Sequence, residues 1–254
     1  MAEQWTFGSL DLQQAGVYGV RLLTAVDGTP GRRSGDVVLP GRRGRRVRYA
    51  PVDQRVISLA LMVQATSRAG LQGNVDALLA ALGGDGRQTL TRTLADGSQR
   101  SLLAEVAASV AVQQQSDRFA SVVVDFLAEP WWQSGSLTST GSGTISSSSK
   151  TFSIVNSGSA EHMAPVVTVV GNITNPKVQI GDVWVQYTGA ITSTLTMTCG
   201  GATVSGGSYS AKNVTHGGAV AWMVIPPGTN TVTVTGSGIS GACSVTVAFY
   251  ARWF

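Results

Sequence analysis

Few side chains in this sequence could carry out a chemical reaction, and those few are scattered. His162 and His216 lie in glycine- or serine-rich stretches, and neither has a second metal ligand at the spacing of a helix or a hairpin. Glu161 and Asp182 are the only carboxylates of residues 131–254, so a glycosidase pair would have to use both. Nothing in their surroundings supports that chemistry. We therefore expect no catalytic residue, no metal and no cofactor, and we predict that the protein is not an enzyme.

Two further patterns match functional motifs only in part. The stretch Gly41-Arg42-Arg43-Gly44 lacks the Gly-Lys-Ser/Thr ending and the following helix of a phosphate-binding loop. Cys199 and Cys243 both lie in strand-like segments and form neither a disulfide framework nor a metal site. Two buried, reduced thiols are the favoured interpretation, although a disulfide bond between them is geometrically possible.

The strongest local feature is a cluster of seven arginines within residues 32–48, in a segment punctuated by proline and glycine. Three interpretations are open: a solvated surface loop, a nucleic-acid contact through phosphates, or a protein contact in which guanidinium groups pair with carboxylates. The cluster contains one aromatic residue, Tyr49, and no basic helix or nucleic-acid motif follows it. These absences argue against specific nucleic-acid binding. Like charges repel one another unless a partner surface neutralises them, which favours the protein contact. The candidate interface residues are Arg42, Arg43, Arg45, Arg46 and Arg48.

Several aromatic residues of the second half could contact a sugar or pack in a core. Trp131 and Trp132 are interpreted as a hydrophobic plug at the junction of two domains, with a sugar-stacking platform as the alternative. Trp184 and Trp222 lie within apolar alternation, so packing in a core is favoured for them. The candidates for a glycan contact are Tyr187 and Tyr209.

The elements that position these residues belong to two halves of different composition. Residues 1–130 hold 14 arginines, no lysine and 12 acidic residues, whereas residues 131–254 hold four basic and two acidic residues. Thirty-six of the latter 124 residues are serine or threonine. The break predicts two domains, 1–130 and 131–254, and residues 131–149 form either a flexible linker or a polar edge strand.

The first half is predicted to be strands with one helix. Leucines and a valine at i, i+4, i+7, i+8 and i+11 give an apolar stripe over 71–82, which Gly83-Gly84 ends. Asp96-Gly97 indicates a two-residue hairpin. The predicted strands are Val17–Val26, Arg55–Ala65, Thr89–Leu94, Ser98–Ala107 and Arg118–Leu127.

The second half alternates apolar residues with serine or threonine, as a half-buried antiparallel sheet does. The clearest segments are residues 194–199, 231–235 and 244–249. Turn signals such as Asn175-Pro176 recur at short intervals, and a β-sandwich is the natural packing for such strands.

No signal peptide is visible at the N-terminus, and no stretch of about 18 apolar residues is present. We therefore expect a protein that folds in a cytoplasm and does not insert into a membrane.

The order of these features resembles the distal tail proteins of siphophages, the phages with long, non-contractile tails, and similar proteins of gene-transfer agents. The segments that carry the resemblance span essentially the whole chain. They are "DVVLPGRRGR", "RVISLALMV", the leucine helix, "TLTRTLADGS", "VVVDFLAEPWW", "IPPGTNTVTVTG" and the terminal "VTVAFYARWF".

The resemblance implies a mainly β subunit in which an N-terminal β-rich domain with one helix joins a hexameric ring. A C-terminal antiparallel β-sandwich, galectin-like or similar to carbohydrate-binding modules, projects outward. The ring is a hub at the distal end of the tail tube of the virion, and it joins the tube protein to tip or baseplate proteins and to the tape-measure protein. The alternative function is attachment to a host cell-wall glycan through the sandwich.

Overall fold

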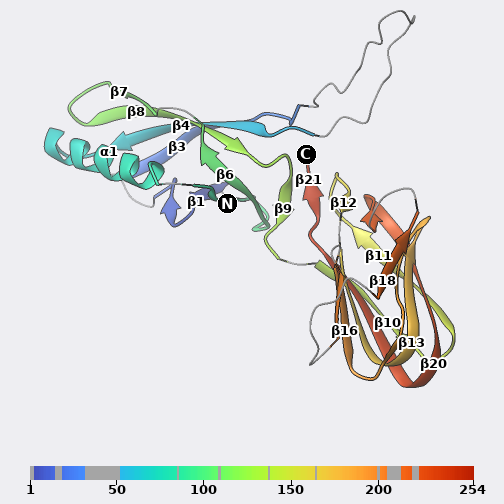
Figure 1. The fold of residues 1–254 in the computed structure, drawn as a ribbon. Coiled ribbons are helices and arrows are strands. Elements are labelled where there is room, and N and C mark those ends of the chain that lie inside the picture. Colours follow the sequence, from blue (N-terminus) through green and yellow to red (C-terminus); the bar gives the residue numbers. More distant parts are fainter. Residues whose placement is uncertain are drawn as a thin grey trace, which may run out of the picture. The chain divides into compact units, whose positions relative to one another are not determined.

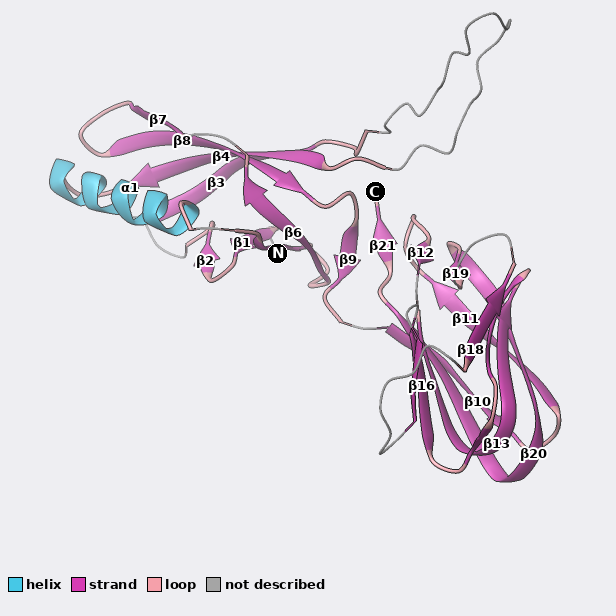
Figure 2. Cartoon of the chain, in the orientation of Figure 1, coloured by secondary structure: helices cyan, strands magenta, loops and turns pink. Residues whose placement is uncertain are grey.

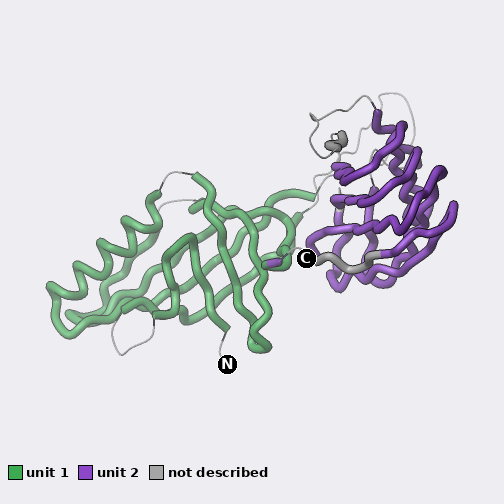
Figure 3. Tube along the Cα trace, turned by 90° about the horizontal axis from the view of Figure 1, so that it is seen from below, with its two compact units in different colours: residues 1–135, 254 green, residues 136–253 purple. Residues whose placement is uncertain are grey.

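A computed structural model describes residues 3–14, 19–31, 52–84, 86–107, 110–136, 138–163, 165–198, 201–204, 213–218 and 223–254. The chain divides into two compact units (Figures 1 and 3), the first formed by residues 1–135 with Phe254 and the second by residues 136–253. Both are built from antiparallel strands, and α1 (Arg68–Leu82) lies in the first (Figure 2). The mainly β fold predicted from the sequence is confirmed.

One antiparallel sheet runs through the first unit in the order β2-β1-β5-β6-β8-β4-β3, with β7 beside β8 and β9 beside β6. All five predicted strands of this half are present. Four strands were not predicted, because two to four residues are too few to show a period of two. The strands are β1 (Gln4–Phe7), β2 (Leu10–Asp11), β3 (Gly19–Asp27), β4 (Arg55–Gln64), β5 (Gln88–Thr93), β6 (Gln99–Val106), β7 (Ala111–Gln114), β8 (Phe119–Ala128) and β9 (Trp132–Ser134).

The helix α1 covers one face of this sheet. It contacts β4, β3 and β8 and buries Leu71, Val75, Leu78 and Leu82, which belong to the predicted apolar stripe. It begins three residues earlier than predicted, because the Ser67 side chain accepts a hydrogen bond from the Gly70 N–H and caps the first turn.

The hairpin between β5 and β6 turns at the predicted residues, but its loop has three residues instead of two. The Gly97 N–H donates to the Leu94 carbonyl, and the Leu94 N–H donates to the Ser98 carbonyl. Gly97 has φ of 83°, which favours glycine, and the Asp96 carboxylate accepts hydrogen bonds from the backbone N–H and hydroxyl of Ser98. These bonds lower the pKa of the Asp96 carboxyl.

The second unit contains a nine-stranded antiparallel sheet and the two-stranded pair β12–β19, and β21 follows them near the C-terminus. Its strands are β10 (Thr138–Ile145), β11 (Ser149–Asn156), β12 (His162–Met163), β13 (Val166–Ile180), β14 (Val183–Tyr187), β15 (Ala190–Ile191), β16 (Thr194–Thr198), β17 (Gly201–Val204), β18 (Val214–Gly217), β19 (Val224–Ile225), β20 (Gly228–Phe249) and β21 (Arg252–Trp253).

Two long strands, β13 and β20, fold this sheet into two layers. Residues 166–170 of β13 pair with β16 and with residues 244–248 of β20, whose end also pairs with β10. Residues 177–180 of β13 pair with β14 and with residues 232–235 of β20, which also pairs with β11. One apolar core holds side chains from both layers, including Val167, Val178, Val234 and Val247. The second unit is therefore an antiparallel sandwich.

Residues 131–254 differ from the expectations in two respects, and one open alternative is decided. The first unit ends at 135 instead of 130, because Gln133 and Ser134 of β9 pair with β6. The Ser/Gly/Thr tract forms strand β10 against β20, so it is an edge strand and not a linker. The pair Asn175-Pro176 does not reverse the chain: β13 continues through it, with φ of 52° at Asn175 and a register shift between Thr174 and Lys177.

Two glycines provide a test of the backbone of the first unit. Replacing Gly97 with alanine is expected to destabilise this unit by about 1–2 kcal/mol, since an L-residue is strained at this φ. Replacing Gly73 with alanine is expected to stabilise the unit by about 1 kcal/mol, because Gly73 is exposed in the middle of α1 with open space around it. Urea unfolding followed by tryptophan fluorescence measures both changes, and equal signs would contradict the turn assignment.

Candidate assembly surface of the first unit

Four adjacent strands of the first unit, β7-β8-β4-β3, form an open stretch of sheet. Residues 120–123 of β8 pair with β7, whereas residues 126–128 pair with β6, so β7 continues the line of β6 along one side of β8. Among the described residues, no strand pairs with the second edge of β7 or of β3. At β3, the Gln14 N–H donates to the Val20 carbonyl. The Val20 N–H in turn donates to the Gln14 Oε1, so Gln14 covers one position of the β3 edge, and no described strand covers the rest.

The two faces of this stretch differ. One face carries the buried side chains Ile57, Leu59, Leu61, Val122 and Val124. The opposite face carries apolar side chains that stay exposed: Val26 by 60%, Val56 by 49% and Val123 by 47%. Such a patch is typical of a contact surface rather than of a solvated face.

A groove lies on the helix side of the same sheet, next to the open edge of β7. Leu71, Val75 and Leu79 of α1 form one wall, and Val112 and Ala120 form the other. Its volume is about 230 Å³, and Val112 is 40% exposed. Arg68, Gln72, Asp76 and Gln114 also line the groove, so the open edge of β7 runs beside an apolar strip with a polar rim.

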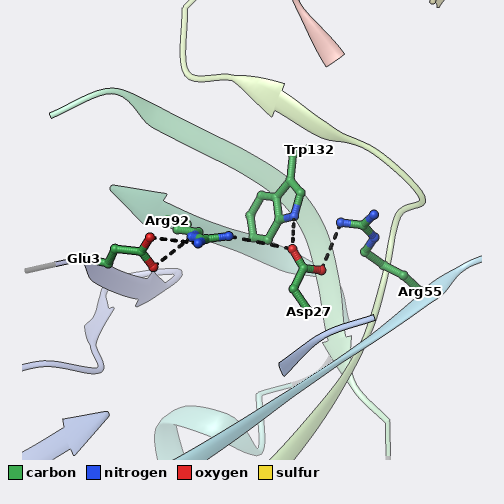
Figure 4. Close-up of polar contacts among 5 residues, drawn as sticks. All are labelled: Glu3, Asp27, Arg55, Arg92 and Trp132. Atoms are coloured by element: carbon green, nitrogen blue, oxygen red, sulfur yellow. Dashed lines mark hydrogen bonds and ion pairs between the residues drawn. The ribbon is translucent and has the colours of Figure 1, made fainter. Parts of the chain in front are cut away.

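At the far end of β3 and β4, a carboxylate joins three segments of the chain (Figure 4). The Arg55 Nη1 donates to Asp27 Oδ1 at 3.0 Å, and the indole Nε1 of Trp132 donates to Asp27 Oδ2 at 2.7 Å. Arg55 and Trp132 are both almost completely buried. A buried guanidinium needs a carboxylate partner, so this ion pair holds the ends of the two strands together.

A second arginine extends this network toward the N-terminus. Arg92 of β5 binds the Glu3 carboxylate with two hydrogen bonds, of 3.1 and 2.8 Å, and lies 3.9 Å from Asp27 Oδ2 (Figure 4). Its guanidinium also lies over the Trp5 ring, 5.4 Å from the centroid, and Trp5 packs edge-on against Trp132 at 5.7 Å. Charge, cation–π and aromatic contacts therefore act together here.

Burial lowers the pKa of the Arg55 guanidinium, and the Asp27 carboxylate opposes this shift. Because arginine starts far above neutral pH, Arg55 remains charged. Burial likewise lowers the pKa of Arg100, and Arg92 lowers it further by repulsion between like charges.

Only some of the predicted site residues lie in the part of the chain that the structure describes. Arg42, Arg43, Arg45, Arg46, Arg48, Tyr209, Trp222 and Cys199 lie outside the described residues. Trp132 lies in the core of the first unit instead of plugging a junction, since its ring contacts Trp5 and its N–H is bound by Asp27. Trp131 is half-buried and packs edge-on against Phe254 at 5.1 Å.

In the second unit, Tyr187 is buried in the sandwich core, so its ring presents little surface on which a glycan could stack. Trp184, expected in the core, is only partly buried: it lies beside Gly217, and the Lys177 ammonium is 4.6 Å from its ring centroid. The alternation misled because the valines on either side of Trp184 belong to the opposite face. Cys243 is a buried free thiol, and burial raises its pKa.

Within the described ranges, no group of three histidine, cysteine or acidic side chains is arranged to hold a metal ion. Across the same ranges, no helix has the length and apolar character needed to cross a membrane. Sequence reasoning missed Asp27, Glu3 and Arg92, whose partners are distant in the chain. The alternation of β3 gave one signal: Asp27 is a charged residue at the end of an apolar strand.

The fold occurs in a known protein. A search of solved structures finds the Dit (gp 19.1) protein of phage SPP1, with a TM-score of 0.73 over 100% of both chains and 13% sequence identity. This chain has the Dit fold. The SPP1 protein is described as a paradigm of the hub adsorption apparatus in phages that infect Gram-positive bacteria. Since the match spans the whole Dit chain, both units belong to the shared fold.

Two structures of the phage p2 baseplate in its activated conformation also align, over 98% of each chain at 10% identity, with TM-scores of 0.42 and 0.43. No protein-family model matches this chain, and no curated protein matches it in sequence. The likeness to Dit is therefore one of fold.

The ion pair at the end of β3 and β4 can be compared with a surface pair. Replacing Asp27 with alanine is expected to destabilise the first unit by about 3–5 kcal/mol, because it leaves the Arg55 charge buried without a partner. Replacing Glu105, which faces Arg87 at 3.8 Å on the surface, is expected to cost about 0–1 kcal/mol. Denaturant midpoints report both, and similar costs would contradict the structural role of Asp27.

Proposed function

We propose that this protein is a structural subunit of a phage tail, in which copies join through the first unit into a ring at the distal end of the tail tube. The ring is a hub that connects the tube to tip or baseplate proteins. The observation that carries the proposal is the open sheet β7-β8-β4-β3 with its two unpaired edges, in a chain with the Dit fold. The proposal includes no enzymatic activity.

The directions of the strands suit such a ring. β3 runs antiparallel to β4, β4 to β8 and β8 to β7, so β7 runs opposite to β3. In a cyclic ring each copy is related to the next by rotation, so every β3 runs in the same sense along the axis. The β7 edge of one copy therefore meets the β3 edge of the next as an antiparallel pair. Backbone N–H and C=O groups of the two copies can then form the hydrogen bonds of an antiparallel ladder.

The side chains at the two edges also fit. Val112, Val122, Leu61 and Leu22 lie in one row across the four strands. A neighbour added at the same height brings its Leu22 region to Val112 and the groove beneath α1. Leu23, at a bulge of β3, is 55% exposed and gains an apolar contact there.

The arginine cluster supplies a second contact in this proposal. The residues on either side of the cluster, Gly31 and Val52, lie next to the ends of β3 and β4. The guanidinium groups of the cluster would pair with carboxylates of a neighbouring subunit or of the tube protein. Six copies, a contact with the tape-measure protein, assembly in the host cytoplasm and a place in the virion tail complete the proposed hub.

The glycan-attachment alternative gains no support from its two tyrosines. Tyr187 is buried, and Tyr209 lies outside the described residues. We therefore do not propose it as a second function.

Paired cysteines test the edge contact. Val112→Cys combined with Leu22→Cys or Leu23→Cys in one chain is expected to give a ladder of covalent oligomers under oxidation, ending at the closed ring. Each single variant stays monomeric on the gel, because the contact joins two different edges. Val112→Cys with Val155→Cys, an exposed valine of the second unit, is the control pair. A dimer from Val112→Cys alone, or no ladder from either double variant, would overturn the proposed pairing.

Replacing all five arginines from Arg42 to Arg48 with glutamine tests the second contact. Folding of the single chain is expected to be unchanged by circular dichroism and thermal unfolding, whereas incorporation into tails is lost. Electron microscopy of particles complemented with the variant measures this. Tails of normal appearance that contain the variant would refute the role of these arginines.

A further inference from the structure

The Asp27 carboxylate binds two separate parts of the first unit: the start of β4, next to the arginine cluster in sequence, and β9, which precedes the second unit. Its Oδ1 accepts from Arg55 Nη1, and its Oδ2 accepts from Trp132 Nε1 (Figure 4). Both donors come from segments far from Asp27 in sequence, one at the start of β4 and the other at the start of β9. One acceptor therefore serves two elements.

On one side are the ends of β3 and β4, which flank the arginine-rich segment. Here the Gly28 N–H donates to the Val56 carbonyl at 3.3 Å, and the Asp53 N–H donates to the Gly31 carbonyl at 2.7 Å. These two backbone bonds set the path on which the chain leaves and re-enters the sheet. The ion pair of Asp27 with Arg55 lies directly beside them.

On the other side is β9, the last strand before the second unit. Trp132 is its first residue, and the first unit ends three residues later, at Gly135. β9 is short, and its register is fixed by Gln133 and Ser134 on β6. The Trp132 side chain is thus a main anchor of the connection to the second unit.

Among the residues that the structure describes, neither donor has a second acceptor within hydrogen-bond distance. Arg55 is 2% exposed, and its Nε has no hydrogen-bond partner. Trp132 is 1% exposed and wedged against Trp5. Arg92, the other cation near Asp27, is bound by Glu3 through two hydrogen bonds. If either donor moves, its hydrogen bond to Asp27 must therefore lengthen, or the Asp27 carboxylate must move with it.

We propose that Asp27 is a positioning residue that couples the ends of β3 and β4 to β9, so that a change on one side shifts the order of the other. The coupling is reciprocal, because it is an interaction free energy between two segments. The element is a conformational relay within the first unit, from the strand ends that flank the arginine cluster to the connection with the second unit. It goes beyond the proposed hub function and does not depend on ring formation.

Hydrogen exchange on the full-length chain tests the relay with two matched tryptophan variants. Trp132→Phe removes the donor to Asp27 and leaves a small cavity in the aromatic cluster. Trp5→Phe leaves a similar cavity in the same cluster but keeps both hydrogen bonds of Asp27. The amides of Gly28 and Asp53 are expected to exchange about tenfold faster in Trp132→Phe and at an unchanged rate in Trp5→Phe.

Amides of β13 and β20 in the second unit serve as the internal reference, and their exchange is expected to stay constant in both variants. Unchanged exchange of Gly28 and Asp53 in Trp132→Phe would overturn the relay. Equal acceleration in both variants would also overturn it, since loss of packing alone would then explain the effect. These outcomes are read on a single chain, so they are independent of the cysteine ladder that tests the ring.

Discussion

A buried guanidinium group needs a carboxylate that balances its charge, and Arg55 has this partner in Asp27. Arg55 begins β4 in the interior, and Asp27 ends β3 beside it. This pair fixes where the two strands stop and where the segment between them starts. The same carboxylate receives the Trp132 indole, so the path toward the second unit is set by the same interaction. The core of this end of the unit is therefore organised around a charge, with the aromatic rings arranged about it.

The parts of the fold that could be predicted are those in which a repeating pattern decides the structure. Ile57 to Val63 on β4 and Leu71 to Leu82 on α1 show periods of two and 3.6, and burial follows them. The pair Asp96-Gly97 favours a tight turn through its own residue types, whatever packs around it. β7 and β9 have three or four residues each, so only their neighbours in space define them. Asp27, Glu3 and Arg92 meet across separations of more than sixty residues, which no local pattern encodes.

The candidate surface is predictable to a similar extent. Alternation identified the inner faces of β4 and β8, and hence which side chains lie on the opposite face. It could not show that this face stays exposed, because burial depends on what else packs there. The Trp184 prediction went wrong for the same reason: flanking valines mark a strand but not the face on which its tryptophan lies. At Asn175-Pro176 a turn pair lies inside a strand, where the bulge of β13 accommodates the missing N–H and the positive φ.

The second half of the chain carries very few charged residues. Four basic and two acidic residues are spread over 124 residues rich in serine and threonine. Electrostatic contacts weaken as ionic strength rises, whereas dispersion contacts and neutral hydrogen bonds change little. Surfaces of the second unit should therefore bind or repel neighbours almost equally in dilute and in saline media. The arginine-rich first unit will respond to such media much more strongly, so one chain combines a salt-sensitive half with a salt-tolerant one.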